Sequence, residues 1–370
     1  MKIIDLIMIL SFGAPLFISL ISMGTIIAYR QTDYNTTKRK LLSLTIGYFL
    51  CVFISSITTI FFIFKWDYYI YSSPLSFLSL TLSVVFFYNI MYILTSPDTS
   101  KSPSVFHYII PVILAVIHAV CSIFTPYSVQ YDIVAHKVLD LDNYKWVCII
   151  YASKLWVYAA YQGIYSLLIL KRMPAYQLHI NNYSADEEKS SLHWIYMVII
   201  LTLIIIPISF ITFFLKKEAT IIDEIIAIIA NILYIVQLVT LQYNMFVENY
   251  IIMSKDSEEL TNNDYDRIKI NKKKFEQYIN DKKPYLNQQL KITDMLYEFH
   301  TCRSYMSAFI NQTYGMNFCC YINTLRMREF ERLKKDPANS KMTDSELIIR
   351  AGFSYRNFIR FKKNKLKGGK

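Results

Sequence analysis

Two groups of short polar and basic side chains near the C-terminus recur at helical spacing. Their members are Arg303, Ser304, Ser307 and Asn311 in the first group and Arg356, Asn357, Arg360 and Lys363 in the second. Residues three or four positions apart share one face of an α-helix, so each group would form one exposed face. Arginine, serine and asparagine bond to base edges in a major groove, and arginine and lysine bond to phosphates. The pattern therefore indicates recognition of nucleic acid.

Each group follows a shorter apolar stretch and a turn. Leu290–Phe299 has apolar residues at helical spacing, and His300–Cys302 separates it from the first group. Thr343 or Asp344 is typical of a helix N-cap, and the segment Gly352–Ser354 is typical of a tight turn before the second group. The order of short helix, turn and longer helix predicts two helix-turn-helix units.

A long helix is expected between the two units. Gly315 would end the helix that carries the first group, Phe318–Lys334 would form the linking helix, and Pro337 would bound it. Two units on such a linker could read successive major-groove segments about 34 Å apart.

This part of the chain resembles the DNA-binding domain of AraC/XylS-type regulators over about Lys283 to Lys363. The residues that carry the resemblance are Pro284-Tyr285-Leu286, Tyr321-Ile322-Asn323 followed by Leu325-Arg326, and Ala351-Gly352-Phe353-Ser354. The resemblance implies a cytoplasmic transcription regulator, usually an activator and often a dimer, that binds double-stranded promoter DNA and contacts RNA polymerase. It places the two polar groups on the two recognition helices. It also implies that Arg326 braces the linker helix or contacts a backbone phosphate.

The preceding part of the chain is strongly apolar. The sequence is 54% hydrophobic and only 18% charged, which suits a membrane protein with a soluble appendage. A span needs about 20 apolar residues. Seven stretches qualify: Leu6–Tyr29, Leu41–Phe64, Leu75–Leu94, Val105–Phe124, Trp146–Leu170, Leu192–Leu215 and Ile221–Phe246. We therefore expect an all-α protein with a seven-helix transmembrane bundle followed by a cytoplasmic double helix-turn-helix domain.

The basic residues support this orientation. Residues 247–370 hold 24 Lys and Arg against 15 Asp and Glu, whereas residues 1–246 hold 15 against 13. A basic soluble region favours nucleic acid or an anionic membrane surface as its partner, and charge alone does not separate the two. If the tail binds DNA it is cytoplasmic, and seven spans then place the N-terminus outside the bacterial inner membrane. The slight excess of Lys and Arg in the loops after spans one, three and five agrees with this.

One charged residue lies inside a predicted span. Lys154 is nine residues into the fifth span, and such a charge usually faces a cavity, a partner or a pathway. One interpretation is that Lys154 binds an anionic signal molecule in a pocket walled by Tyr151, Tyr158 and Tyr161. The other, which we favour, is that it snorkels or bonds to helix carbonyls.

The sequence divides into three regions: residues 1–246 form the sensor domain, residues 247–282 a helical connector and residues 283–370 the DNA-binding domain. The connector carries a weak heptad-like stripe, so a homodimer through a coiled coil is one way to transmit a signal. The chain lacks the motifs of common enzymes, and we expect no catalytic residues, cofactor or metal. The main hypothesis is a membrane-embedded transcription regulator that responds to a small molecule or a membrane signal. The alternative is a receptor or transporter-like membrane protein whose degenerate tail binds a cytoplasmic protein.

Overall fold

All regular elements of the described chain are helices, and the fold is all-α. The structure is a computed structural model that describes residues 3–32, 36–97, 103–136, 138, 140, 142–214, 221–253 and 270–368. The chain divides into two compact units. The bundle unit comprises Met1–Thr95, Lys101–Arg172 and His193–Glu248, and the tail unit comprises Ser96–Ser100, Met173–Leu192 and Asn249–Lys370.

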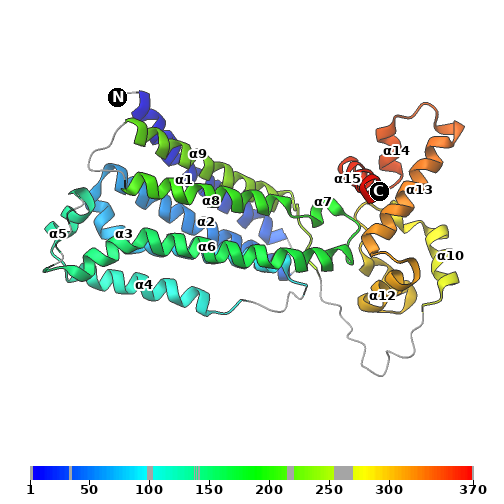
Figure 1. Cartoon of the computed structure of the whole chain (residues 1–370), viewed down its shortest axis with the longest axis horizontal. Coiled ribbons are helices and arrows are strands. Elements are labelled where there is room, and N and C mark those ends of the chain that lie inside the picture. Colours follow the sequence, from blue (N-terminus) through cyan, green and yellow to red (C-terminus); the bar gives the residue numbers. More distant parts are fainter. Residues whose placement is uncertain are drawn as a thin grey trace, which may run out of the picture. The chain divides into compact units, whose positions relative to one another are not determined.

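Long helices run side by side in the bundle unit (Figure 1). They are α1 (Ile3–Thr32), α2 (Thr36–Phe64), α3 (Trp66–Thr95), α4 (Phe106–Ile123), α6 (Lys145–Asn181, to Arg172 in this unit), α8 (His193–Phe214) and α9 (Ile221–Phe246). Helix α1 packs against α2 and α9, α3 packs against α2 and α4, and α8 packs against α9. Between α4 and α6 lie the short helix α5 (Tyr127–Tyr131) and the π-helical turn η1 (Asp132–His136).

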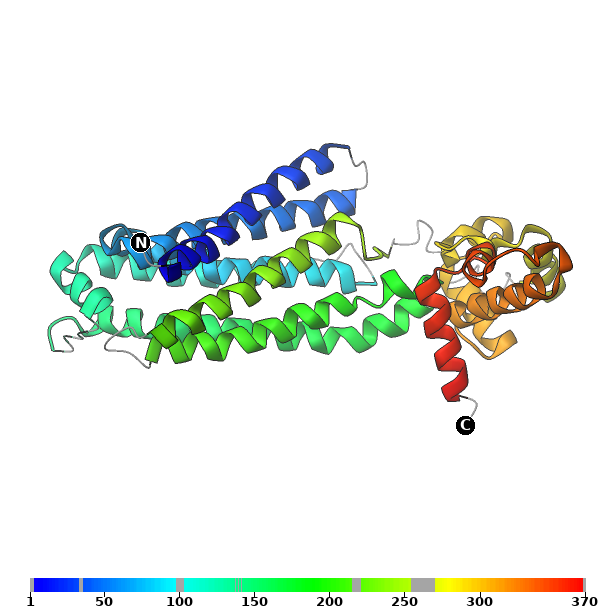
Figure 2. The same ribbon diagram turned by 90° about the horizontal axis from the view of Figure 1, so that it is seen from above.

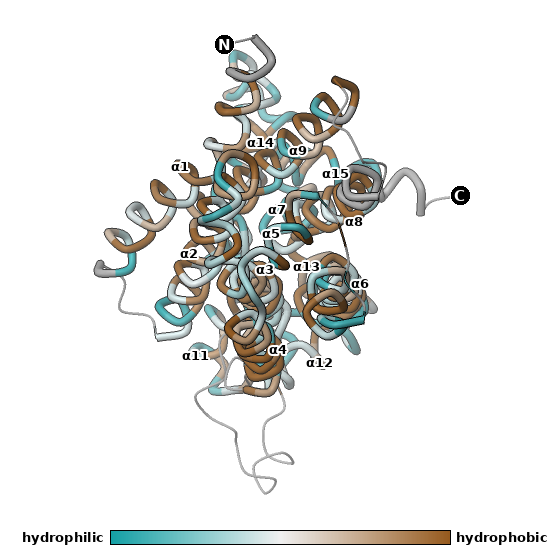
Figure 3. Tube along the Cα trace, turned by 90° about the vertical axis from the view of Figure 1, so that its left-hand side faces the viewer, coloured by the Kyte–Doolittle hydropathy of each residue, from teal (hydrophilic) through white to brown (hydrophobic). Residues whose placement is uncertain are grey.

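Six helical segments among the described residues are long and apolar enough to cross a membrane. They are Ile7–Arg30, Thr36–Phe64, Trp66–Thr95, Phe106–Ile123, Glu187–Ile208 and Glu224–Phe246. Figure 3 shows long hydrophobic stretches, drawn in brown, along helices of this unit such as α4. These segments identify a membrane protein.

Helix α6, which contains the fifth predicted span, is not among these six segments. It is 37 residues long, so its length is ample, but Lys145, Lys154, Lys171 and Arg172 lower its hydropathy. Length and composition therefore support six of the seven predicted spans.

The tail unit forms its own apolar core from several short helices, which lie together in Figure 2 (yellow to red). Its helices are α7 (Glu187–Ser190), α10 (Lys272–Lys282), η3 (Pro284–Leu286), η4 (Ile292–Met295), α11 (Leu296–Phe299), α12 (Arg303–Tyr314), α13 (Phe318–Lys335), η5 (Pro337–Asn339), α14 (Asp344–Arg350) and α15 (Tyr355–Gly368). In the first half, the ring of Phe275 lies 5.1–6.1 Å from those of Phe299, Phe309, Tyr314 and Tyr321. In the second half, α13, α14 and α15 bury a cluster of Met327, Phe330, Leu347, Ile348, Ala351, Phe353 and Phe358.

The ends of the tail helices follow the local signals in the sequence. Helix α12 ends at Gly315, whose φ of 69° is readily adopted by glycine. The side chain of Thr343 accepts a hydrogen bond from the backbone of Glu346, and the carboxylate of Glu346 bonds back to Thr343, which forms a capping box at α14.

The stretch Leu290–Phe299 differs from the single helix expected there. Lys291 pairs as an isolated β-bridge with Ser184, and only then do η4 and the four-residue α11 follow. The backbone of residues 290–292 bonds to another segment of the chain, so it cannot make helical bonds there.

The tail unit contains a segment that we did not assign to it from the sequence. Met173–Leu192, which follows the fifth predicted span, packs in this unit together with residues 270–368. Of the predicted connector, residues 254–269 lie outside the described residues, and with them Leu260 of the heptad-like stripe, whereas its other two members, Tyr250 and Met253, are described and buried. The predicted helix in the second half of the connector is described from Lys272, where Asn271 caps α10.

Candidate nucleic-acid interface

Helix α12 carries the first group of polar residues on its outer side. Met306 and Ile310 are fully buried and hold the helix on the core, whereas Ser304 and Asn311 are exposed. Arg303 and Ser307 are half-buried at the edge of this face. The arrangement leaves short polar side chains facing outward on α12, which follows the short helix α11 and a turn, and base-edge contacts would require such a face.

Helix α15 carries the second group of polar residues, but not all of them are exposed as predicted. Phe358 packs into the core, and Arg356 and Lys363 are exposed as expected. Arg360 is half-buried, and Asn357 is only 3% exposed. In this structure Asn357 therefore cannot reach DNA, because a neighbouring segment covers it.

Arg326 is not available to a phosphate, and its predicted role as a DNA contact is wrong for this conformation. Its side chain is completely buried. It donates hydrogen bonds to the backbone carbonyls of Tyr285 (2.7 Å), Asn287 (2.6 Å), Gln288 (3.3 Å) and Ala185 (3.1 Å), and to the side chain of Asn323 (2.9 Å). Burial lowers the pKa of Arg326 to about 10, so the guanidinium remains charged at neutral pH. Arg326 thus ties α13 to the chain before η4, which is the bracing role considered from the sequence.

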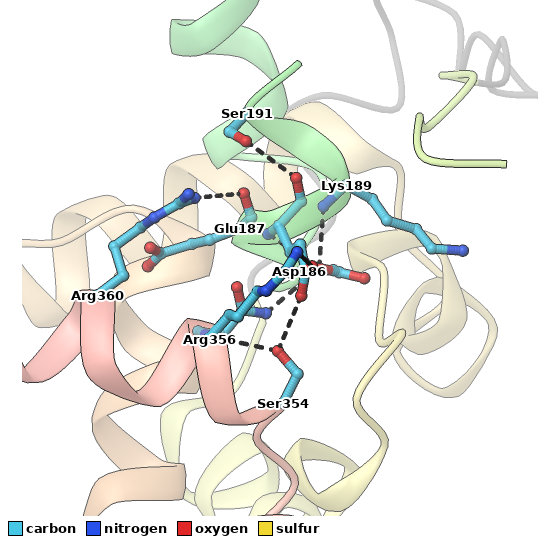
Figure 4. A network of polar contacts seen from close by, with 9 residues as sticks. Asp186, Glu187, Lys189, Ser191, Ser354, Arg356 and Arg360 are labelled. Carbon is cyan, nitrogen blue, oxygen red and sulfur yellow. Dashed lines mark hydrogen bonds and ion pairs between the residues drawn. The ribbon is translucent and has the colours of Figure 1, made fainter. Parts of the chain in front are cut away.

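An acidic segment covers the outer face of α15. Figure 4 shows Asp186 and Glu187 lying against Ser354, Arg356 and Arg360. All of these residues belong to the tail unit. The side chain of Asp186 also accepts from the backbone N–H groups of Glu188 and Lys189, and so caps the short helix α7.

The contacts between this acidic segment and α15 pair oppositely charged and polar groups. Arg356 Nη1 lies 2.9 Å from Glu188 Oε1, and Arg360 donates to the backbone carbonyl of Glu187 at 2.8 Å. Asn357 Nδ2 donates to Asp186 Oδ1 at 3.3 Å. Sequence reasoning missed this arrangement, because only Lys and Arg were weighed in the loop after the fifth predicted span. Three consecutive acids at 186–188 were the signal that could have found it.

Glu187 reaches further into the unit than its neighbours. Its Oε1 accepts a hydrogen bond from Asn323 Nδ2 at 3.1 Å and lies 3.7 Å from Cys319 Sγ, both on α13. This places a carboxylate beside the guanidinium of Arg326, so the acidic segment also balances the buried charge of the brace.

The polar residues proposed to sense a ligand lie in the bundle unit, where Lys154 contacts Tyr151 and helix α3. Lys154 bonds to the hydroxyl of Ser73, and its Nζ lies 4.2 Å from the centre of the Tyr151 ring. Tyr158 accepts from Gln162 within α6, at 2.9 Å. Lys154 thus has partners inside the bundle unit, but they are a hydroxyl and an aromatic ring and not the helix carbonyls considered from the sequence.

Comparison of the chain with protein-family models, with curated proteins and with solved structures found no match.

Proposed function

We propose that this protein is an integral membrane transcription regulator that binds promoter DNA through α12 and α15. One observation carries the proposal. Two arrangements of short helix, tight turn and longer helix share the linker α13, and each longer helix carries arginine and amide groups at helical spacing. The net basic charge of residues 247–370 supplies the long-range attraction to DNA.

The tail occupies the cytoplasm in this proposal, and the bundle holds it at the inner membrane. Signals reach the bundle as a small molecule, as a change in the membrane or through a partner protein. A homodimer would double the number of recognition helices and strengthen binding to a paired site.

Replacing Arg356 and Arg360 together by alanine should abolish promoter binding. Each arginine that contacts bases or phosphates contributes about 1–3 kcal/mol, so losing two weakens binding on the order of 100-fold or more. The measurement is genome-wide DNA occupancy of the intact protein in the cells that produce it. Discrete promoter peaks are expected for the unaltered protein, or for variants in which the charges of Glu187 and Glu188 have been removed.

The matched control is Lys273→Ala/Lys282→Ala. It removes the same charge from exposed positions on α10, outside both helix-turn-helix arrangements, and should keep the peaks. Absence of peaks from every variant, with the protein confirmed in the membrane, would instead support the alternative of a tail that binds a cytoplasmic protein.

Helix α6 completes a bundle of seven spans in this proposal. Three of its polar side chains that lower its hydropathy have partners in the bundle unit. Lys154 bonds to Ser73, Gln162 to Tyr158, and Arg172 donates to Thr95 at 3.0 Å. Tyr165 adds a bond of 2.8 Å to His107 of α4. Because these groups are satisfied within α6 or by a neighbouring helix, they do not need water.

The number of spans has a direct consequence for the two ends of the chain. Seven spans place the N-terminus and the tail on opposite sides of the membrane, whereas six place them on one side. We expect a cysteine added before Ile3 to react with a membrane-impermeant maleimide in intact cells, and one at the exposed Ser345 of α14 to react only after lysis. Equal reactivity of the two positions in intact cells would contradict a seven-span topology.

A further inference from the structure

The chain between α6 and α8 is built into the tail unit through its backbone. Ala185 N–H donates to the carbonyl of Leu290 at 3.1 Å, and Ile292 N–H donates to the carbonyl of Tyr183 at 2.9 Å. Tyr183, Ser184 and Ala185 are all buried. The segment Tyr183–Lys189, which we call the acidic clasp, is thus an ordered part of the tail unit.

The acidic clasp touches both candidate recognition helices. The guanidinium of Arg303, the first residue of α12, lies 5.8 Å from the centre of the Tyr183 ring. On α15, Glu188 pairs with Arg356, Asp186 accepts from Asn357, and the backbone of Glu187 accepts from Arg360. Four of the residues assigned to DNA binding therefore contact one short segment.

The clasp supplies to α15 the groups that DNA would supply. Carboxylate and carbonyl oxygens occupy the donors of Arg356, Asn357 and Arg360, as phosphate oxygens and base acceptors do in a complex. Helix α7 also lies directly against α15 (Figure 4), where a groove wall would have to lie. One face of α15 cannot hold both occupants.

We propose that the acidic clasp is an autoinhibitory competitor of DNA, and that the structure shows the closed state; this rests on the proposed DNA-binding function. The clasp releases α15 when DNA is to be bound. It joins the end of α6 to the start of α8, so a signal that shifts either helix acts on the clasp through the chain itself.

The contacts on α15 are weak enough to be reversed. The side chain of Arg356 is 83% exposed, and an ion pair at such a surface contributes only about 0–1 kcal/mol. Asn357 Oδ1 is buried and has no hydrogen-bond partner among the described residues, which further weakens the closed state. A switch needs a closed state that is favoured over the open state by only a few kcal/mol, and contacts of this strength meet that condition.

Glu187→Gln/Glu188→Gln should open the clasp, because it removes two charges while keeping the shape of both side chains. The experiment uses the full-length protein in nanodiscs of neutral phosphatidylcholine and a duplex from the occupancy map, or a 30-bp duplex at low salt if no peak is found. We expect DNA affinity to rise about 10-fold or more. The apparent Kd for DNA falls as the fraction of protein molecules with an open clasp grows. Glu188→Lys, which repels Arg356, should have at least the same effect.

Two controls separate release of the clasp from other causes. Asp281→Asn/Glu331→Gln removes the same charge from exposed positions elsewhere in the tail and should raise affinity much less. In the unaltered protein, saturating DNA should speed amide exchange at Ala185 and Ile292, whose N–H groups hold the clasp to the chain before α11.

The outcomes distinguish the two proposals. Equal affinities for the unaltered protein and both clasp variants, or equal gains from the control pair, would overturn autoinhibition and leave DNA binding intact. Slower or unchanged exchange at Ala185 and Ile292 on DNA binding would overturn it as well. No DNA binding by any variant, the clasp variants included, would overturn DNA binding itself.

Discussion

Replacing Arg326 by methionine is expected to destabilise the whole tail unit by about 3–5 kcal/mol, the usual cost of removing one partner from a buried charged network. The methionine side chain fills a similar volume but donates no hydrogen bond. It would leave the carbonyls of Tyr285, Asn287 and Ala185 buried without their donor, and an unsatisfied buried acceptor costs about 1–3 kcal/mol. The effect should extend from α13 to η3 and to the acidic clasp.

Amide exchange of the full-length protein in nanodiscs measures this effect. Exchange in η3, α13 and residues 183–185 should accelerate together in Arg326→Met, while the bundle unit stays unchanged. Arg328→Met is the matched control, since Arg328 is exposed on the same helix two residues away. Arg326→Lys should fall between the two, because one ammonium cannot reach the five acceptors that a guanidinium serves. Equal exchange in Arg326→Met and Arg328→Met would show that the brace contributes little.

Local signals in the sequence located most of the helices. Gly315, Thr343 and Pro337 act within one or two turns of their own position, and the helix ends lie where they predict. The long apolar stretches likewise became long helices, because a span of apolar residues can satisfy its backbone only within itself.

The features that could not be predicted from the sequence are contacts between residues far apart in the chain. Arg356 and Glu188 are 168 residues apart, and no local pattern pairs them. The bridge between Ser184 and Lys291 interrupts a stretch whose periodicity is helical. For Arg326, the sequence left open a phosphate contact or a brace, and only the positions of the surrounding carbonyls select the brace. Hydropathy likewise counts Lys154 as a charge that disfavours a span in α6. It takes no account of Ser73 on α3, which bonds to Lys154.

Gly352→Ala is expected to disrupt the turn between α14 and α15, whereas Gly315→Ala should be mild. Both glycines have positive φ, 86° at Gly352 and 69° at Gly315. A left-handed conformation costs a residue with a Cβ about 1–2 kcal/mol, and at Gly315 that is the whole cost, since a Cβ there would meet nothing within 4 Å.

At Gly352 a second penalty adds to the conformational one. An added Cβ would lie 2.5 Å from the carbonyl oxygen of Tyr285 and 2.7 Å from the Cα of Leu286. Both atoms belong to the backbone of η3, whose carbonyl at Tyr285 already holds Arg326. The turn before α15 or η3 must therefore shift, and the total cost should reach about 3 kcal/mol or more.

The pair of variants separates the clash from the conformational strain that both share. In full-length protein, we expect Gly352→Ala to lower the melting temperature of the tail several times more than Gly315→Ala does. Thermal unfolding of the tail is measured by protease cleavage between η3 and α15. Promoter binding should be lost with Gly352→Ala, because α15 no longer lies in register with α12 on the shared linker. Equal and small shifts for the two variants would mean that the contact between this turn and η3 does not position α15.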